Sequence, residues 1–233
     1  MSLFAIADTH LSFSCDKPMD IFRGWQNFEK RLEKNWNAVV GEDDFVIIPG
    51  DVSWGMNMDE TLEDFRFLDS LNGTKIIMKG NHDYWWSTKS KTEKFFAEND
   101  IKTVKVLFNN AYKMGDYTVC GTRGWLCPND VRFTEQDKKI YEREQVRLRL
   151  SLDAAMRNGA ENIILMMHYP PMNDQKEDSA FTELFREYPI RKVVYGHLHG
   201  EASHATGFEG ERYGVEYELV AADYIDFCPK RIL

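Results

Sequence analysis

The sequence is poor in cysteine and has no long apolar run. Its 233 residues include four cysteines, and no two of them form a C-x-x-C pair. Four cysteines are sparse for a disulfide framework at this size, so we expect reduced thiols and a cytoplasmic location. The longest apolar runs, Leu3–Ala7 and Ile163–Met167, have five residues, whereas a membrane-spanning helix needs about 20. The opening residues MSLFAIADTH resemble no secretory signal, so we expect neither secretion nor a membrane partner.

The sequence also lacks a surplus of positive charge. It has 29 lysines and arginines against 38 aspartates and glutamates, a formal net charge of -9. Lysine and arginine supply most of the affinity for a phosphate backbone, so this balance argues against a long nucleic acid as partner. It leaves room for a small phosphorylated substrate.

No internal repeat or linker rich in proline, glycine or serine interrupts the sequence, so we predict a single domain over residues 1–233. Apolar spacing and capping residues predict helices at about 25–39, 58–71 (ended by Gly73), 87–99 (capped by Ser87), from Thr134 past Ala155, and 182–187. Short apolar runs predict strands at Leu3–Ala7, Phe45–Ile48, Lys75–Met78, Val104–Phe108, Tyr117–Gly121, Asn162–Met167 and Lys192–Tyr195.

The alternation of strands with helices predicts an α/β fold. The runs at 104–121 have no helix between them, and the tail at about 204–223 has the pattern of one or two strands around turn glycines. We therefore expect two sheets or one mixed sheet, with the helices outside.

Polar side chains with metal-binding chemistry follow five of the predicted strands. They are Asp8 and His10, then Asp51, then Asn81, His82 and Asp83, then His168, and last His197 and His199. A single histidine after a strand is most often a solvated loop residue, and a single Gly-Asp pair is a common turn. The joint pattern differs, because the carboxyl ends of strands in an open α/β sheet form the usual ligand site. Imidazole and carboxylate are ligands of borderline divalent metals.

These motifs resemble the five ordered signatures of the calcineurin-like metallophosphoesterase superfamily. The signatures are D8-x-H10, G50-D51, G80-N81-H82-D83, H168 and G196-H197-x-H199. The resemblance spans residues 8–199 and implies a β-sandwich of two mixed sheets flanked by helices. It also implies a site for two metal ions, in which Asp51 bridges both.

The resemblance assigns the ligands residue by residue. One ion would be held by Asp8, His10, Asp51 and His199, and the other by Asp51, Asn81, His168 and His197. These donors permit Mn²⁺, Fe²⁺/Fe³⁺, Zn²⁺ or Co²⁺. His82 would face the leaving-group oxygen, with Asp83 fixing its tautomer. The implied activity is hydrolysis of a phosphodiester or phosphomonoester, in which a hydroxide bridging the ions attacks phosphorus in line.

Other residues near these motifs have two interpretations each. Arg123, between two glycines after a predicted strand, either binds phosphate or is a surface arginine. The aromatic residues Trp54, Tyr84, Trp85 and Trp86 either stack on a substrate ring or pack loops against the core, and we expect packing for at least two. Residues 11–24 form a long connection that has the length of a lid. Residues 174–178 have the composition of a solvated acidic loop.

The resemblance leaves three functions to be compared: a small phosphohydrolase or phosphodiesterase, a nuclease and a non-catalytic scaffold. The chain has G-D-V-S-W-G and G-N-H-D where Ser/Thr protein phosphatases carry G-D-x-V-D-R-G and G-N-H-E, so it is more similar to the small bacterial-type phosphohydrolases and phosphodiesterases. A nuclease of the same superfamily is an alternative that the acidic balance disfavours. A non-catalytic scaffold that binds metal and a protein partner is the alternative outside enzymes; scaffolds typically lack ligand residues, and here every ligand position is present.

Overall fold

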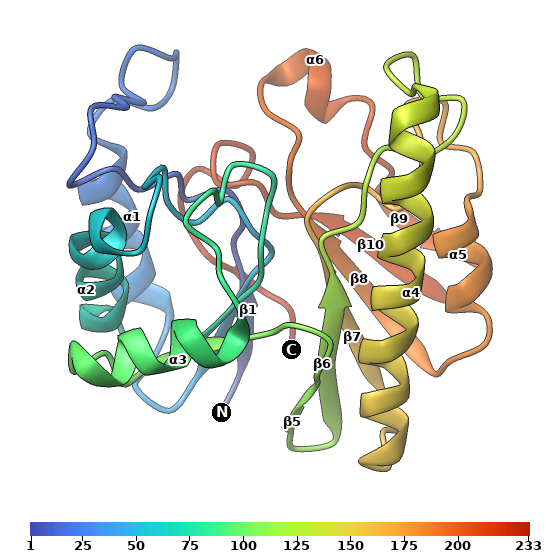
Figure 1. Cartoon of the computed structure of the whole chain (residues 1–233), viewed down its shortest axis with the longest axis horizontal. Helices are drawn as coiled ribbons and strands as arrows, with labels where there is room; N and C mark the ends of the chain where they lie inside the picture. Colours follow the sequence, from blue (N-terminus) through green and yellow to red (C-terminus); the bar gives the residue numbers. More distant parts are fainter. The chain divides into compact units, whose positions relative to one another are not determined.

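The computed structural model describes residues 1–233, which form two compact units (Figure 1). The first unit contains Met1–Val106 and returns at Val220–Leu233, and the second contains Leu107–Leu219. Each unit has its own sheet. The prediction of a single domain over residues 1–233 is not tested by this division and stays a prediction.

The sheet of the first unit has the order β11-β1-β2-β3-β4. The first four strands along the chain, β1 to β4, are parallel to their neighbours, and β11 is antiparallel to β1. The strands are β1 (Leu3–Ala5), β2 (Phe45–Ile48), β3 (Thr74–Ile77), β4 (Val104–Val106) and β11 (Lys230–Arg231). The helices between them are α1 (Phe28–Val39), α2 (Leu62–Ser70), preceded by the 3-10 turn η1 (Asp59–Thr61), and α3 (Lys89–Glu98).

The helix boundaries in this unit differ from the prediction. Helix α1 begins at Phe28; Trp25 precedes it, and its buried ring lies edge-on to Phe227 at 4.9 Å. Val39 is 41% exposed, so the buried face of α1 ends at Trp36. The cap of α3 is Thr88, not Ser87, because the Thr88 side chain accepts a hydrogen bond from the backbone N–H of Lys91.

The sheet of the second unit has the order β5-β6-β7-β8-β10-β9. Its inner strands are parallel, and the two edge strands are antiparallel to their neighbours. The strands are β5 (Tyr112–Met114), β6 (Tyr117–Thr122), β7 (Ile163–Met167), β8 (Ile190–Tyr195), β9 (Gly210–Arg212) and β10 (Val215–Leu219). The helices are α4 (Glu135–Arg157), α5 (Ala180–Phe185) and α6 (Glu201–His204). Helix α4 packs against β6 and α5.

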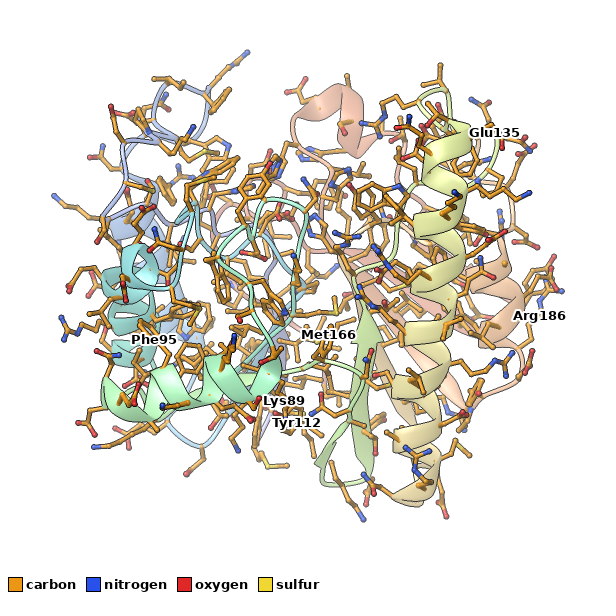
Figure 2. All side chains as sticks on the ribbon, viewed as in Figure 1. Lys89, Phe95, Tyr112, Glu135, Met166 and Arg186 are labelled. Carbon is orange, nitrogen blue, oxygen red and sulfur yellow. The ribbon has the colours of Figure 1, made fainter.

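The long helix α4 follows the predicted pattern. Thr134 precedes it, and the backbone N–H of Thr134 donates to the carboxylate of Asp137 at 2.8 Å. Figure 2 marks Glu135 in its first turn, where a negative charge interacts favourably with the helix dipole. Helix α5 begins two residues earlier than predicted, because the Ser179 hydroxyl accepts from the backbone N–H groups of Phe181 and Thr182.

The structure confirms the predicted α/β class with two mixed sheets flanked by helices. The region 104–121 differs in detail, because β4 belongs to the first sheet and a short strand that the sequence pattern missed, β5, pairs with β6 in the second. The two predicted tail strands are β9 and β10. No helix in the structure combines the length and apolar character needed to cross a membrane.

A buried carboxylate on α2 anchors two loops of the first unit. Asp64 is fully buried and accepts hydrogen bonds from the Ser53 hydroxyl and, at 2.8 Å, from the backbone N–H of Phe13. Burial raises the pKa of Asp64 to about 6, and the two hydrogen bonds oppose this shift. Asp64 therefore fixes the start of the 11–24 connection and the segment that follows Asp51.

The raised pKa of Asp64 predicts how stability changes with pH. Between about pH 4 and pH 6 the folded state binds this proton more tightly than the unfolded state, so the free energy of unfolding should fall as pH rises, by up to about 3 kcal/mol. The side chain at this position in the variant Asp64→Asn cannot ionise, so this pH-dependent part of the free energy of unfolding should be absent. Urea unfolding at pH 4 to 7 in the presence of a chelator should show the difference, with Asp59→Asn, at an exposed position, as the matched control. Parallel pH profiles for the wild type and Asp64→Asn would contradict the assignment.

Candidate functional site

In the first unit, the loops that follow β1 and β2 run side by side. The backbone N–H of Asp8 donates to Gly50 O at 3.0 Å, and the N–H of His10 donates to Asp51 O at 3.0 Å. The N–H of Leu11 continues the series to Val52 O, also at 3.0 Å. The parallel pairing of the two strands thus continues past their ends and brings Asp8 and His10 next to Asp51.

The loop after β3 is joined to these loops by the carboxylate of Asp83. This side chain is fully buried, and its oxygens accept hydrogen bonds from five N–H groups. The donors are the backbone N–H groups of Asp51 (2.9 Å), Val52 (2.9 Å), Ser53 (3.2 Å) and Gly80 (2.6 Å), and the indole N–H of Trp85 (3.0 Å). Burial raises the pKa of Asp83, and these hydrogen bonds oppose the shift because they favour the ionised form.

This contact set corrects the role predicted for Asp83. The carboxylate does not orient the ring of His82; it holds the backbone of the Asp51 loop against Gly80. The approach is so close that a Cβ atom on Gly80 would lie 2.1 Å from Asp51 Oδ1. Only glycine fits at position 80 without displacing the predicted bridging carboxylate.

The candidate ligands of the first unit lie close together and have strained backbones. Within the first unit, metal-binding atoms of Asp8 lie within 4.8 Å of those of His10 and of Asp51. All three side chains are buried. Their φ angles are +60° for Asp8, +46° for His10 and +51° for Asp51, in the left-handed region that costs an ordinary residue about 1–2 kcal/mol. Such strain is typical of functional sites.

His82 lies beside these residues with its ring in an aromatic cluster. Its backbone N–H donates to Asp51 Oδ1 at 2.8 Å. Its ring centroid lies 4.5 Å from that of Trp54, and Trp54 stacks on His10 at 4.9 Å with an interplanar angle of 19°. Asn81, the adjacent candidate ligand, is half-buried in the same turn.

The four aromatic residues near these motifs have different environments. Trp85 is buried and lies edge-on to Phe65 at 5.0 Å, as expected for a packing residue. Trp86 packs against Trp85 at 5.2 Å. The side chain of Tyr84 is 55% exposed. Packing thus accounts for Trp85 and Trp86, while Trp54 lies against the candidate site.

In the second unit, the carbonyl of Arg123 joins the loops that follow β6 and β7. It accepts hydrogen bonds from the backbone N–H groups of His168 (3.1 Å) and Tyr169 (2.9 Å). The N–H of Gly196, after β8, donates to His168 O at 3.2 Å. His168 and His197 therefore lie at the ends of adjacent parallel strands, as the sequence predicts.

One nitrogen of His168 and one of His197 lie at a distance that suits a shared metal ion. His168 Nε2 lies 3.3 Å from His197 Nδ1. Two nitrogens that bind one ion at about 2.0–2.1 Å with a tetrahedral angle would lie about 3.3 Å apart. His168 is fully buried, and His197 has a left-handed φ of +71°. His199, the remaining candidate ligand, lies two residues further along and is half-buried.

Arg123 is not a surface arginine. Its side chain is 14% exposed, and its guanidinium lies 4.4 Å from the centroid of the Trp125 ring. Its terminal nitrogen lies 3.5 Å from the carboxylate of Glu144, while Nε is buried with no hydrogen-bond partner in the structure. Burial lowers the pKa of Arg123, and Glu144 opposes this shift. The guanidinium is held in place between Trp125 and Glu144.

Glu144 is a residue of this site that the sequence analysis missed. It is fully buried on α4, where its carboxylate accepts hydrogen bonds from the Thr122 hydroxyl and from Arg147, both at 2.7 Å. Its position between Tyr141 and Leu148, on the apolar face of the helix, is an anomaly visible in the sequence. A charged residue on such a face indicates a buried ionic partner.

A family model described as "Calcineurin-like phosphoesterase" matches residues 1–201. A curated protein, "Uncharacterized protein MJ1445" of Methanocaldococcus jannaschii, is 33% identical over 86 residues, which are 35% of this chain and 46% of that protein. The chain thus matches less than half the length of this relative.

Solved structures give the same fold. The phosphopantetheinyl hydrolase PptH of Mycobacterium tuberculosis superimposes with a TM-score of 0.59 at 14% identity, covering 100% of this chain and 95% of that chain. TT1561 of Thermus thermophilus superimposes with a TM-score of 0.53 at 12% identity, covering 87% and 85%. At these identities the likeness concerns the fold alone. The match of the family model over most of the sequence shows that the chain belongs to the calcineurin-like phosphoesterase family.

Proposed function

We propose that the protein hydrolyses small phosphoesters with two metal ions, one held by Asp8, His10, Asp51 and His199 and the other by Asp51, Asn81, His168 and His197. The observation that carries this proposal is the coincidence of backbone strain with candidate ligands. Asp8, His10, Asp51 and His197 all have left-handed φ angles. A fold retains such strain where the side chain must be held in a particular place.

The donor chemistry fits transition metals, since it combines imidazole and carboxylate. Bound ions would supply an activated water as nucleophile and positive charge for the phosphoryl oxygens. Asp8 and Asp51 contribute negative charge to the site, and Asp83 keeps the Asp51 loop in place without being a ligand. Mn²⁺, Fe²⁺/Fe³⁺ and Zn²⁺ are the ions to test.

Two further side chains have proposed roles toward the substrate. His82, whose ring lies against Trp54 and whose backbone N–H donates to the Asp51 carboxylate, would assist the leaving group by giving it a proton. Arg123 would bind a phosphoryl oxygen through its guanidinium, which Glu144 and Trp125 hold in one orientation.

The competing function is that of a metal-binding scaffold for a protein partner. The strained ligand positions and the prepared Arg123 favour the enzyme, because a scaffold needs neither an anion-binding arginine nor an acid beside the ligands. The net charge of -9 disfavours a nuclease that grips long nucleic acid. A cytoplasmic location remains a proposal, supported by four cysteines that are all free thiols.

Hydrolysis of bis-p-nitrophenyl phosphate tests the function most simply. Protein loaded with Mn²⁺ should release p-nitrophenol far faster than Mn²⁺ alone, and diesters should be cleaved at least as well as monoesters, since the protein-phosphatase loop motifs are missing. A panel of phosphomonoesters, diesters and cyclic nucleotides should then rank substrates. No turnover with any of the candidate metals from pH 5 to 9 would favour the scaffold, and hydrolysis of monoesters alone would contradict the diester preference.

Asp51→Asn should lose metal and activity together. The variant removes the one negative charge that both ions would share, so the two cations would repel each other in a partly dehydrated site. Metal analysis after gel filtration should show lower occupancy than in the wild type. Full occupancy in Asp51→Asn would show that Asp51 is not the bridging ligand.

His82→Ala should keep both metals and lose only leaving-group assistance. General-acid catalysis is typically worth about 10²–10⁴ in rate, so esters of high-pKa alcohols should slow by this amount. Esters of p-nitrophenol need little protonation and should slow much less. Loss of metal, or equal slowing of both ester types, would remove His82 from this role.

Arg123→Ala should raise KM at least tenfold while metal content stays unchanged, since one charge-assisted contact to phosphate is lost. Arg123→Lys keeps the charge but not the planar fork, so it should restore binding only in part. Arg66, an exposed arginine on α2, provides the matched control Arg66→Ala. An unchanged kcat/KM for Arg123→Ala would show that Arg123 serves the fold alone.

A further inference from the structure

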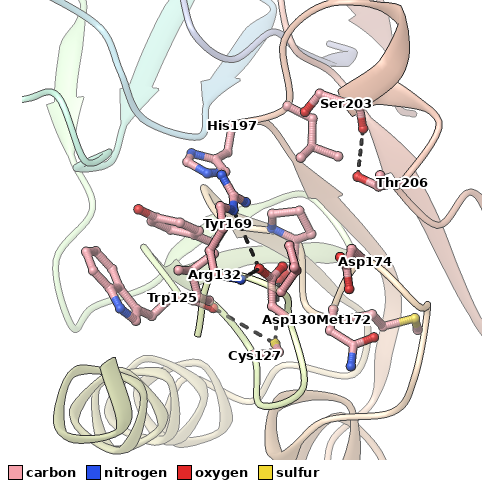
Figure 3. A pocket seen from close by; sticks show the side chains of 15 residues that line it. Trp125, Cys127, Asp130, Arg132, Tyr169, Met172, Asp174, His197, Ser203 and Thr206 are labelled. Carbon is pink, nitrogen blue, oxygen red and sulfur yellow. Dashed lines mark hydrogen bonds and ion pairs between the residues drawn. The ribbon is translucent and has the colours of Figure 1, made fainter. Parts of the chain in front are cut away.

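A cavity of about 180 Å³ in the second unit lies beside the candidate ligand His197 (Figure 3). Three loops form it, which follow the parallel strands β6, β7 and β8. Trp125 and Cys127 come from the first loop, Tyr169 and Asp174 from the second, and His197 from the third. The carboxyl ends of parallel strands are the usual place for a ligand in an α/β fold.

Aromatic residues that line the cavity contact the proposed catalytic groups. The Tyr169 ring lies 4.0 Å from the ring of His197, and Trp125 lies 4.9 Å from Tyr169. Trp125 also contacts the guanidinium of Arg123. A molecule whose phosphate lies near His197 and Arg123 can therefore place its remaining part in this cavity.

The lining combines apolar surface with carboxylates. Cys127, Met172 and Leu198 are buried and apolar. The carboxylate of Asp130 is 8% exposed and accepts the backbone N–H of Arg132 at 2.9 Å. Asp174 is half-buried. In Figure 3 it lies on the right, and Trp125 lies on the left. Arg132 is the one arginine or lysine of the lining; its side chain is 60% exposed, with Nε 3.5 Å from Asp130.

We infer that this cavity binds the organic group of the substrate and selects a neutral or positively charged group over an anionic one. The inference deepens the proposed function and rests on it. The carboxylates of Asp130 and Asp174 accept hydrogen bonds from hydroxyl or ammonium groups and repel carboxylates. The aromatic wall suits a ring or a quaternary ammonium. The volume suits one small group, since a cavity of about 150 Å³ holds a benzene molecule.

The test measures binding of three phosphate compounds to protein loaded with Mn²⁺, by titration calorimetry. Phosphocholine carries a positive organic group, phosphoglycolate a negative one, and inorganic phosphate none. We expect phosphocholine to bind about tenfold more tightly than phosphoglycolate. Hydrolysis of bis-p-nitrophenyl phosphate is measured on the same samples.

Two variants with matched controls locate the effect. Ser203→Trp should fill the cavity and weaken the binding of phosphocholine about tenfold, while the binding of inorganic phosphate stays unchanged. Ala202 is exposed on the same short helix α6, so Ala202→Trp should change the binding of neither compound. Asp174→Asn should reduce the preference for phosphocholine over phosphoglycolate about fivefold, whereas the exposed Asp116→Asn should not. Asp174→Asn keeps the test decisive if Ser203→Trp does not fold.

The outcomes separate this inference from the proposed function. Selective binding of phosphocholine that both variants weaken supports the cavity, even if no hydrolysis is seen, in which case the proposed function fails. Hydrolysis with no preference for phosphocholine, or with a preference that neither variant changes, overturns the cavity and leaves the proposed function standing. Failure of all three compounds to bind overturns the cavity as well.

Discussion

The carboxylate of Asp83 is the interaction on which the candidate site of the first unit depends. Each of the loops after β2 and β3 must turn sharply at the end of its strand, and each leaves backbone N–H groups that a buried loop cannot give to water. Asp83 accepts four of these N–H groups, from Asp51, Val52, Ser53 and Gly80. The contact also fixes the strained conformation of Asp51, because the turn cannot relax without breaking these hydrogen bonds. Gly80 permits the approach that makes this possible.

In the second unit, the acceptor for buried loop N–H groups is a backbone carbonyl instead of a carboxylate. The Arg123 carbonyl accepts the N–H groups of His168 and Tyr169, and the side chain of the same residue lies between Trp125 and Glu144. One residue thus supports a candidate ligand through its backbone and carries through its side chain the guanidinium that we propose as the phosphate-binding group. This arrangement uses a buried ion pair, which is costly to desolvate and is retained where it keeps a charged group in place.

Much of this structure was predictable because its strands are buried apolar runs that end in polar residues. The five motifs at strand ends, the two mixed sheets and the long helix after Thr134 follow from that pattern. The edge strand β5 and the two-residue β11 were not predictable, since short edge strands carry almost no apolar pattern. The role of Asp83 was mistaken because a buried carboxylate that binds backbone N–H groups leaves no trace in the sequence of its partners. The cavity beside His197 was not predictable because its walls come from three loops far apart in the sequence.

The central claim is that two metal ions share the carboxylate of Asp51. Crystals grown with Mn²⁺, with anomalous diffraction measured at the manganese edge, test it directly. The account predicts two manganese peaks about 3.5–4 Å apart, with an oxygen of Asp51 bound to each. A single peak, or two peaks without Asp51 between them, would contradict the account.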